Sequence, residues 1–189
     1  MNRVVIPALV ILALVIFGLS TFRALTNGAG KGANGSSQDE HSDAERQGSV
    51  VPDLEIQELG KKDAVPLSKH LGKVTLVNFW ATWCEACIVE MPSIRKLNDA
   101  FSSQGFKVLA INLDEEVGPA ITKAVHDFGM NFGVYLDPKQ ELSDYFDIHA
   151  IPFTAILDRN RKVLLTESGE KDWNSAEMHE KIARWLKEP

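Results

Sequence analysis

The pattern of apolar and polar positions between Val50 and Pro189 alternates between strand and helix periods. Runs rich in Val, Leu, Ile and aromatic residues are typical of buried strands, and segments with the 3.6-residue period of amphipathic helices separate them. The predicted strands cover residues 50–59, 63–67, 73–80, 106–113, 153–158 and 162–168, and the predicted helices cover about 85–102, 118–128, 139–146 and 175–187. Asn174 is the expected N-cap of the last helix, because Glu177 follows three residues later. Strands that alternate with helices before a closing hairpin and helix predict an α/β domain with a mixed central sheet.

A membrane-spanning segment is predicted at the amino terminus. Val4 to Phe22 form an uncharged run of 19 residues, which as a helix is about 28 Å long and so close to the thickness of a bilayer's hydrocarbon core. Arg3 precedes the run, and the positive-inside rule therefore places the short amino terminus in the cytoplasm and the rest of the chain outside. A cleaved signal peptide is the rival interpretation, because Gly18 to Ser20 offer small residues to a peptidase. We expect residues 1–23 to be retained as an anchor, since the apolar run is longer than a usual signal-peptide core.

Residues 24–49 are predicted to be a flexible linker. They are rich in Gly, Ser, Asn and charged residues, and they carry almost nothing apolar with which to form a core. A flexible coil of that length has a root-mean-square span of roughly 30 Å. We therefore expect residues 50–189 to be one globular domain, held near the outer surface of the membrane.

Charge and histidine spacing argue against two classes of function. The formal net charge of -6 is unlike that of a nucleic-acid-binding protein, which concentrates Lys and Arg on one face. A structural zinc site needs four ligands, whereas the chain has only two cysteines and its five histidines are scattered singly. We interpret His41, His70, His126, His149 and His179 as surface residues. We expect neither a metal site nor a nucleic-acid partner.

Both cysteines lie in the stretch ATWCEAC, where a predicted strand gives way to a predicted helix. Cys84 is therefore expected at or just before the helix N-terminus, where unpaired backbone N–H groups and the helix dipole stabilise a thiolate. Cys87 follows within the first helical turn, close enough to bond to Cys84. A static disulfide closes too small a loop here to stabilise the fold much, and copper bound by the two thiolates alone is a further interpretation. The placement favours a disulfide that opens and closes with little movement of the backbone.

Two motifs resemble those of the thioredoxin superfamily. They read LVNFWATWCEACIVEMP and, about 60 residues later, AIPFTAILD. More narrowly, the chain resembles the membrane-tethered, extracytoplasmic TlpA/ResA-like branch of bacterial thiol–disulfide oxidoreductases. The resemblance covers about residues 50–188 and rests on the CxxC pair together with Trp83, Pro92 and Ile151-Pro152. It implies a thioredoxin fold with an N-terminal strand extension and a central insert at about residues 113–147.

The resemblance also implies roles for individual residues. Cys84 matches the exposed nucleophile, and Cys87 matches the buried thiol that resolves the mixed disulfide. Pro152 matches a cis-proline that faces the cysteines and exposes the backbone of the residue before it to an extended substrate. We expect Trp83, Glu85 and Ile151 to contact the substrate. Trp83 is expected to shield the sulfur atoms, although Trp80 and Trp83 also fit the pattern of core aromatic residues.

Two positions depart from the patterns of relatives. Thioredoxins carry a buried acid in the strand before the motif, and Asn78 occupies that place here. An amide cannot relay a proton to or from Cys87. Proteins similar to ResA have instead a Glu three residues after the second cysteine, and Glu90 matches it, on the same helix face as Cys87. A solvated surface Glu90 is the alternative. Ala86 stands where the ResA-like motif commonly has Pro.

The resemblance predicts an enzyme that keeps particular extracytoplasmic thiols reduced in an oxidising compartment. Its expected substrates are apocytochrome c or copper-site cysteines, its electron donor is a CcdA/DsbD-type membrane protein, and its only redox group is the Cys84–Cys87 pair. The negative charges of Glu85 and Glu90 destabilise a thiolate and so favour a reductant over a disulfide oxidant. By resemblance, Ile151 before the proline is also the residue that reducing thioredoxins carry. A thioredoxin-like module that carries copper or holds a partner is the competing function.

Overall fold

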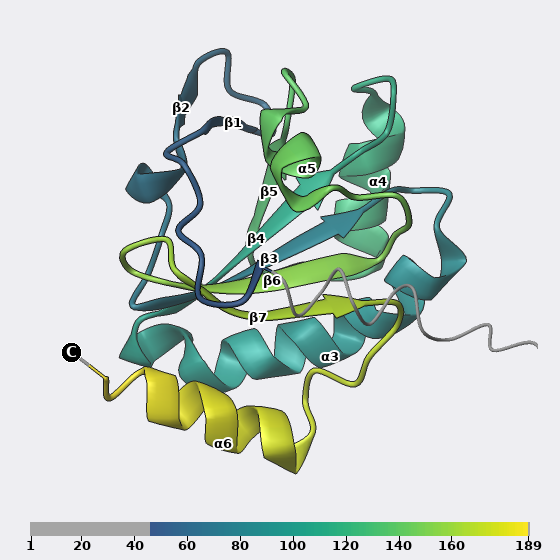
Figure 1. Cartoon of the computed structure of the whole chain (residues 1–189). Coiled ribbons are helices and arrows are strands. Elements are labelled where there is room, and N and C mark those ends of the chain that lie inside the picture. Colours follow the sequence, from purple (N-terminus) through teal and green to yellow (C-terminus); the bar gives the residue numbers. More distant parts are fainter. Residues whose placement is uncertain (1–45, 189) are drawn as a thin grey trace, which may run out of the picture. The chain divides into compact units, whose positions relative to one another are not determined.

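Residues 46–188 are described by the computed structural model, and they form an α/β domain around a seven-stranded sheet (Figure 1). The strands are β1 (Glu55–Glu58), β2 (Ala64–Pro66), β3 (Val74–Trp80), β4 (Phe106–Asn112), β5 (Gly133–Leu136), β6 (Phe153–Asp158) and β7 (Val163–Ser168). The helices are α3 (Glu85–Phe101), α4 (Pro119–Asp127), α5 (Glu141–Phe146) and α6 (Ala176–Trp185), with short 3-10 turns η1 (Leu67–Lys69) and η2 (Ser102–Gln104). The predicted α/β class and mixed central sheet are confirmed.

The strand order brings the end of β3 beside the start of β6. Across the sheet the order is β2-β1-β5-β4-β3-β6-β7. The strands β3, β4 and β5 are parallel, and the other neighbouring pairs are antiparallel. Phe79, near the end of β3, pairs with Phe153 at the start of β6. The residues that follow β3 and those that precede β6 therefore meet at one end of the sheet.

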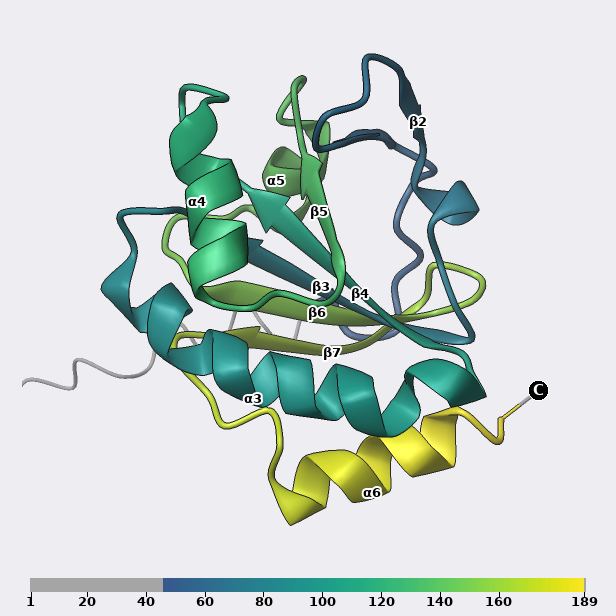
Figure 2. The same ribbon diagram turned by 180° about the vertical axis from the view of Figure 1, so that it is seen from behind.

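Helices cover both faces of the sheet, and the alternation along β3 decides which side chain faces which layer (Figures 1 and 2). Leu76 and Trp80 belong to a core cluster with residues of α3, α4 and α6. Val77 and Phe79 belong to a second cluster with residues of β1 and α5. Asn78 lies between Val77 and Phe79 in the strand, so its side chain points to the opposite face of the sheet, toward α3. All seven residues of β3 are buried, as expected for a central strand with both faces covered.

Two local features differ from the sequence prediction. The strand β5 lies inside the expected insert, and with only four residues it is too short to show a clear strand period. Asn174 is not the N-cap of α6, because the Ser175 side chain accepts the capping hydrogen bond from the backbone N–H of Met178 at 3.4 Å. The Asn174 side chain instead bonds to the ring of His179 at 2.9 Å, which occupies its oxygen.

His70 is not the surface residue that we expected. Its ring packs edge-on against Tyr135, with ring centroids 4.6 Å apart, and its Nε2 atom is buried. This burial lowers the pKa of His70. His179 is also half-buried, whereas the side chains of His126 and His149 are exposed as expected.

The predicted anchor at residues 1–23 and most of the predicted linker lie outside the described residues, as does His41. Residues 46–49, the end of that linker, are described, and there the backbone N–H of Gly48 donates to the Val163 carbonyl at 2.8 Å. No helix within residues 46–188 is both long and apolar enough to cross a membrane. The membrane segment stays a prediction.

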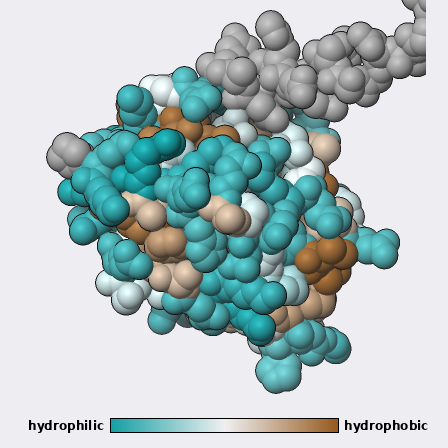
Figure 3. Space-filling model, turned by 90° about the horizontal axis from the view of Figure 1, so that it is seen from below, coloured by the Kyte–Doolittle hydropathy of each residue, from teal (hydrophilic) through white to brown (hydrophobic). Residues whose placement is uncertain are grey.

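The outer surface on the side of α3 and α6 is largely hydrophilic (Figure 3). Apolar residues form only small patches in this view. Apolar residues of both helices lie inside instead, in the core cluster that includes Met91 and Ile94 of α3 and Met178 and Ile182 of α6.

Candidate active site

The two cysteines form a disulfide at the N-terminus of α3. Cys84 is the N-cap residue, and its Sγ accepts a hydrogen bond from the backbone N–H of Cys87 at 3.2 Å. The Cα atoms of the pair are 5.3 Å apart, so the first helical turn holds the disulfide at the predicted place. Cys84 is 6% exposed and Cys87 is fully buried. Cys84 is therefore the more accessible of the two, although it is less exposed than the resemblance implied.

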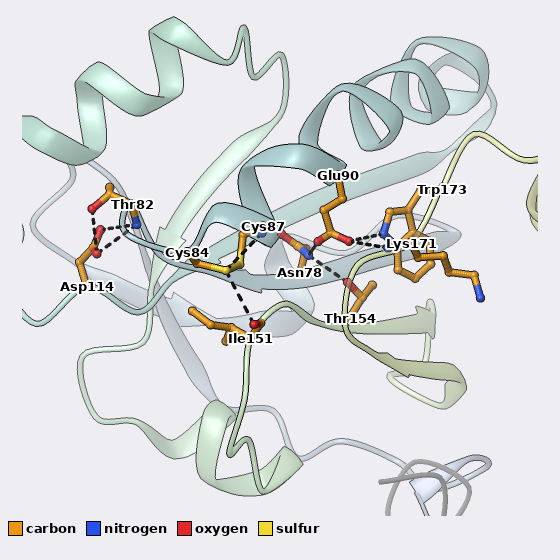
Figure 4. The surroundings of a disulfide bond; sticks show 10 residues. All are labelled: Asn78, Thr82, Cys84, Cys87, Glu90, Asp114, Ile151, Thr154, Lys171 and Trp173. Atoms are coloured by element: carbon orange, nitrogen blue, oxygen red, sulfur yellow. Dashed lines mark hydrogen bonds between the residues drawn. A yellow bond between two sulfur atoms is a disulfide. The ribbon is translucent and has the colours of Figure 1, made fainter. Parts of the chain in front are cut away.

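The loop between β3 and Cys84 is braced by Asp114, which lies just beyond β4. The Asp114 carboxylate accepts hydrogen bonds from the backbone N–H of Thr82 at 3.1 Å and from the Thr82 hydroxyl at 3.0 Å. It also accepts one from the side-chain amide of Asn112 at 2.9 Å. Because β3 and β4 are parallel neighbours, Asp114 can hold the approach to the cysteines from the adjacent strand end (Figure 4). Sequence reasoning missed Asp114; an acid directly after a buried strand is the signal that could have found it.

Ile151 and Pro152 lie beside the disulfide, and the peptide bond between them is cis, as the resemblance implied. The Ile151 carbonyl oxygen is 3.7 Å from the Sγ of Cys84 (Figure 4). A disulfide sulfur carries no proton, so this approach is a contact in the oxidised protein. A carbonyl oxygen at that position is a group to which a Cys84 thiol could donate a hydrogen bond in the reduced protein. The antiparallel pairing of β6 with β3 is what brings these distant parts of the chain together.

Glu90 lies on the buried face of α3, one helical turn after Cys87. It is 2% exposed, so the interpretation as a solvated surface residue is wrong. The carboxylate accepts hydrogen bonds from the Asn78 amide at 2.7 Å, the Trp173 indole at 3.0 Å and the backbone N–H of Lys171 at 3.4 Å. Burial raises the pKa of Glu90 to about 7, although these hydrogen bonds act in the opposite sense. A carboxyl group with such a pKa can take up and release a proton near neutral pH.

Thr154 and Trp173 complete this buried polar cluster. Thr154 pairs with Asn78 in the register of β3 and β6, and its hydroxyl accepts a hydrogen bond from the Asn78 amide at 2.9 Å. Trp173 belongs to the segment between β7 and α6 and is fully buried. Sequence reasoning missed both residues. The burial of Glu90 does have a signal, since Glu90 falls on the same helical stripe as Cys87 and other core residues of α3.

Trp80 and Trp83 lie in opposite environments. Trp80 is fully buried in the core, whereas Trp83 is 73% exposed next to Cys84. Glu85, between the cysteines, is also exposed. Trp83 is therefore not a core aromatic residue. Its expected shielding of the sulfur atoms stays a prediction.

An open hollow beside the cysteine loop is acidic. It has a volume of about 430 Å³ and is lined by Thr82, Trp83, Leu113, Asp114, Glu115, Glu116 and Ala120. The lining includes three carboxylates and neither Lys nor Arg. A protein segment that docks there therefore meets a negative potential.

Comparisons with known proteins give consistent matches. The Redoxin family model matches residues 46–182. The thiol-disulfide oxidoreductase ResA of Geobacillus kaustophilus is 30% identical over 132 residues, which are 70% of this chain and 75% of that protein. ResA of Bacillus subtilis is 32% identical over 123 residues, which are 65% of this chain and 68% of that protein. A structure assigned to a thiol:disulfide interchange protein DsbE from Chlorobium tepidum has a TM-score of 0.65 and 30% identity, and the match covers 74% of this chain and 97% of that one.

Proposed function

Because the chain belongs to the Redoxin family and is a thiol–disulfide oxidoreductase with a thioredoxin-like fold, we propose that it reduces particular protein disulfides outside the cytoplasm. The observation that carries the proposal is the Cys84–Cys87 disulfide at the N-terminus of α3, with Ile151 beside it. Cys84 is the more accessible cysteine, so a partner's sulfur atom reaches it first.

The reduced protein acts in two thiol–disulfide exchange steps. The Cys84 thiolate attacks one sulfur of the substrate disulfide, which forms a mixed disulfide and releases the other substrate sulfur as a thiolate. The Cys87 thiolate then attacks the Sγ of Cys84, which releases the second substrate thiolate and forms the Cys84–Cys87 disulfide. Two electrons pass to the substrate. The two protons lost by the cysteines are balanced by the two that the substrate thiolates take up.

Glu90 handles the proton of Cys87 in this scheme. The two residues are three positions apart on α3 and share its buried face. Cys87 must lose its proton before it can attack, and no bulk water surrounds a fully buried thiol. With a pKa of about 7, Glu90 is ionised often enough at neutral pH to accept that proton.

The substrate docks as an extended segment along Ile151. The backbone of this residue lies next to Cys84, where main-chain hydrogen bonds could align a substrate cysteine for attack. Trp83 and Glu85 are exposed on either side of Cys84 in the sequence and contact the same segment. Pro152 holds Ile151 in this orientation.

Electrons flow toward the substrate in this proposal, because carboxylates outweigh the groups that stabilise a thiolate. Glu85 lies between the cysteines, and Glu90 follows one turn later. Negative charge near a thiol disfavours its thiolate and so makes the dithiol a better reductant. The Cys87 backbone N–H that bonds to the Sγ of Cys84 acts in the opposite direction. By resemblance, Ile151 is also the residue that reducing thioredoxins carry before the proline.

The cellular setting is part of the proposal. Residues 1–23 anchor the chain in the cytoplasmic membrane, and the predicted linker that follows them leaves the redox domain on the extracytoplasmic side. A CcdA/DsbD-type membrane protein supplies electrons. The substrates are disulfides of apocytochrome c or of copper-site proteins.

Reduction of insulin by dithiothreitol, followed as turbidity, tests the activity. The full-length chain is expected to accelerate the reaction, and the Cys84→Ser variant is expected to be inactive. A parallel titration with Cu(I) distinguishes the competing function. Tight copper binding without acceleration of insulin reduction would identify a copper carrier and refute the reductase.

A further inference from the structure

Two of the three N–H groups that bond to the Glu90 carboxylate come from the segment that joins β7 to α6 (Figure 4). Trp173 donates from its indole to Oε2 at 3.0 Å, and Lys171 donates from its backbone to the same oxygen at 3.4 Å. Asn78 donates to Oε1 at 2.7 Å from the other side. Both carboxylate oxygens are therefore bonded, and the side chain is held in one orientation toward β3.

Trp173 is itself fixed against α3. Its backbone N–H donates to the Ser93 hydroxyl at 3.1 Å, and that hydroxyl donates to the backbone carbonyl of Glu90 at 2.7 Å. The Trp173 side chain is fully buried, and the ammonium group of Lys171 lies over its ring at 5.9 Å from the centroid. The indole is thus a donor with little freedom to move.

The chemistry of the indole favours one protonation state of Glu90. An indole N–H can only donate, so it stabilises the ionised carboxylate, whose oxygens both accept, more than the neutral carboxyl group. Burial favours the neutral form instead, and the negative charge of Glu170 acts in the same sense. With both effects present, the pKa of Glu90 is about 7. Without the indole donor, fewer hydrogen bonds would oppose the effect of burial, and the pKa of Glu90 would be higher.

Glu90 also borders an open hollow beside α3. The hollow has a volume of about 230 Å³, lies between α3 and residues 170–172, and is also lined by Ser93 and Lys96 among others. Solvent therefore comes close to Glu90 on this side, although only 2% of the residue is exposed.

We propose that Trp173 is a positioning residue of the redox centre, which holds the Glu90 carboxylate against Asn78 and keeps it able to accept the proton of Cys87. The inference rests on the proposed function, because it requires Glu90 to handle that proton. It assigns a functional role to a residue 83 positions beyond Glu90, outside both motifs that carry the resemblance.

The test replaces the indole N–H and leaves the shape of the side chain nearly unchanged. In the full-length chain, Trp173→benzothienylalanine exchanges the N–H for sulfur. The reduced protein is mixed with 4,4′-dithiodipyridine from pH 5 to pH 9, and the second-order rate constant is plotted against pH. The inflection that Glu90→Gln abolishes belongs to Glu90. In the Trp173 variant this inflection is expected about one pH unit higher, which corresponds to the loss of one hydrogen bond to a charged group.

The matched control is the same replacement at Trp80. That indole is also fully buried, but its N–H has no hydrogen-bond partner among the described residues, so the inflection should not move. Thermal unfolding at pH 5, where Glu90 is protonated, checks that both variants fold, and Trp173→Phe gives a second variant without the donor. An unchanged inflection in both Trp173 variants would make Trp173 a core residue only, and the proposed function would survive. A wild-type profile that Glu90→Gln does not alter would refute both the positioning role and the proton role of Glu90, although insulin reduction could still proceed.

Discussion

The side-chain amide of Asn78 on β3 donates a hydrogen bond to the carboxylate of Glu90 on α3, at 2.7 Å. Thioredoxins carry a buried acid on the strand before the cysteine motif. Here that strand position holds the amide of Asn78, and the buried acid, Glu90, lies on the helix instead. A buried carboxyl group is therefore still present near the cysteine motif, but it is attached to a different element. Its proton affinity differs from that of a surface Glu because the site is desolvated.

Glu90→Gln should slow thiol–disulfide exchange near pH 7, by up to about 10²-fold. Gln retains the size of Glu and one of its two accepting oxygens, but it cannot accept the proton of Cys87. Stopped-flow reduction of a model disulfide by the reduced protein measures the rate. Wild-type rates in the variant across the whole pH range would show that Glu90 has no part in proton transfer.

The same substitution should change how stability depends on pH. In the folded protein the pKa of Glu90 is about 7, raised from 4.5 chiefly by burial, so the folded state binds a proton more tightly than the unfolded state. The stabilisation from this proton is complete below about pH 4.5 and is lost as the pH rises toward 7. The total change is about 3 kcal/mol, from 1.36 kcal/mol per pKa unit.

Guanidinium unfolding of the oxidised protein at pH 4.5 and pH 8 measures this change. The wild-type protein should lose about 3 kcal/mol of unfolding free energy between the two pH values relative to Glu90→Gln, which lacks the titrating group. Parallel pH dependences of the two proteins would contradict a raised pKa.

Cys87→Ser should accumulate mixed disulfides with partner proteins in cells. The variant keeps the more accessible Cys84 and lacks the buried thiol that resolves the intermediate. Non-reducing gels followed by mass spectrometry identify the trapped partners, and Cys84→Ser is the control. If the control traps partners equally well, the roles of the two cysteines are assigned in the wrong order.

The main elements of the fold have clear signals in the sequence. β3 is a continuous apolar run, and the helical period of α3 follows it closely, so the position of the cysteines at the helix N-terminus follows from local pattern. β5 lacks such a signal because its four residues are ordered by pairing with β1 and β4, which are distant in the sequence.

The environment of Glu90 could be predicted only in part. Its place on the helical stripe of Cys87 indicates burial, but its partners come from other elements. Thr154 meets Asn78 through the β3–β6 register, and Trp173 arrives from the segment after β7. Such long-range contacts depend on tertiary packing, which no local period encodes. The contact between Asp114 and Thr82 also depends on tertiary packing, because only the parallel pairing of β3 and β4 brings the two residues together.

The membrane anchor predicts how the full-length chain fractionates. The protein should stay with the membrane after a carbonate wash, because the apolar run from Val4 to Phe22 is long enough to span the bilayer. N-terminal sequencing of the recovered protein should find residues 1–23 intact. A soluble protein with a new amino terminus near Thr21 would show that the segment is a cleaved signal peptide.

The reduction potential of the Cys84–Cys87 pair tests the central claim, that this oxidoreductase is a reductant, most directly. Equilibration of the full-length protein with glutathione buffers, read by tryptophan fluorescence, gives the value, and Cys84→Ser gives the redox-independent baseline. The carboxylates of Glu85 and Glu90 disfavour the thiolate form, so the potential should lie nearer that of thioredoxin, about −270 mV, than that of DsbA, about −120 mV. A potential above roughly −160 mV, on the side of DsbA, would contradict the reductase and indicate an oxidant or isomerase.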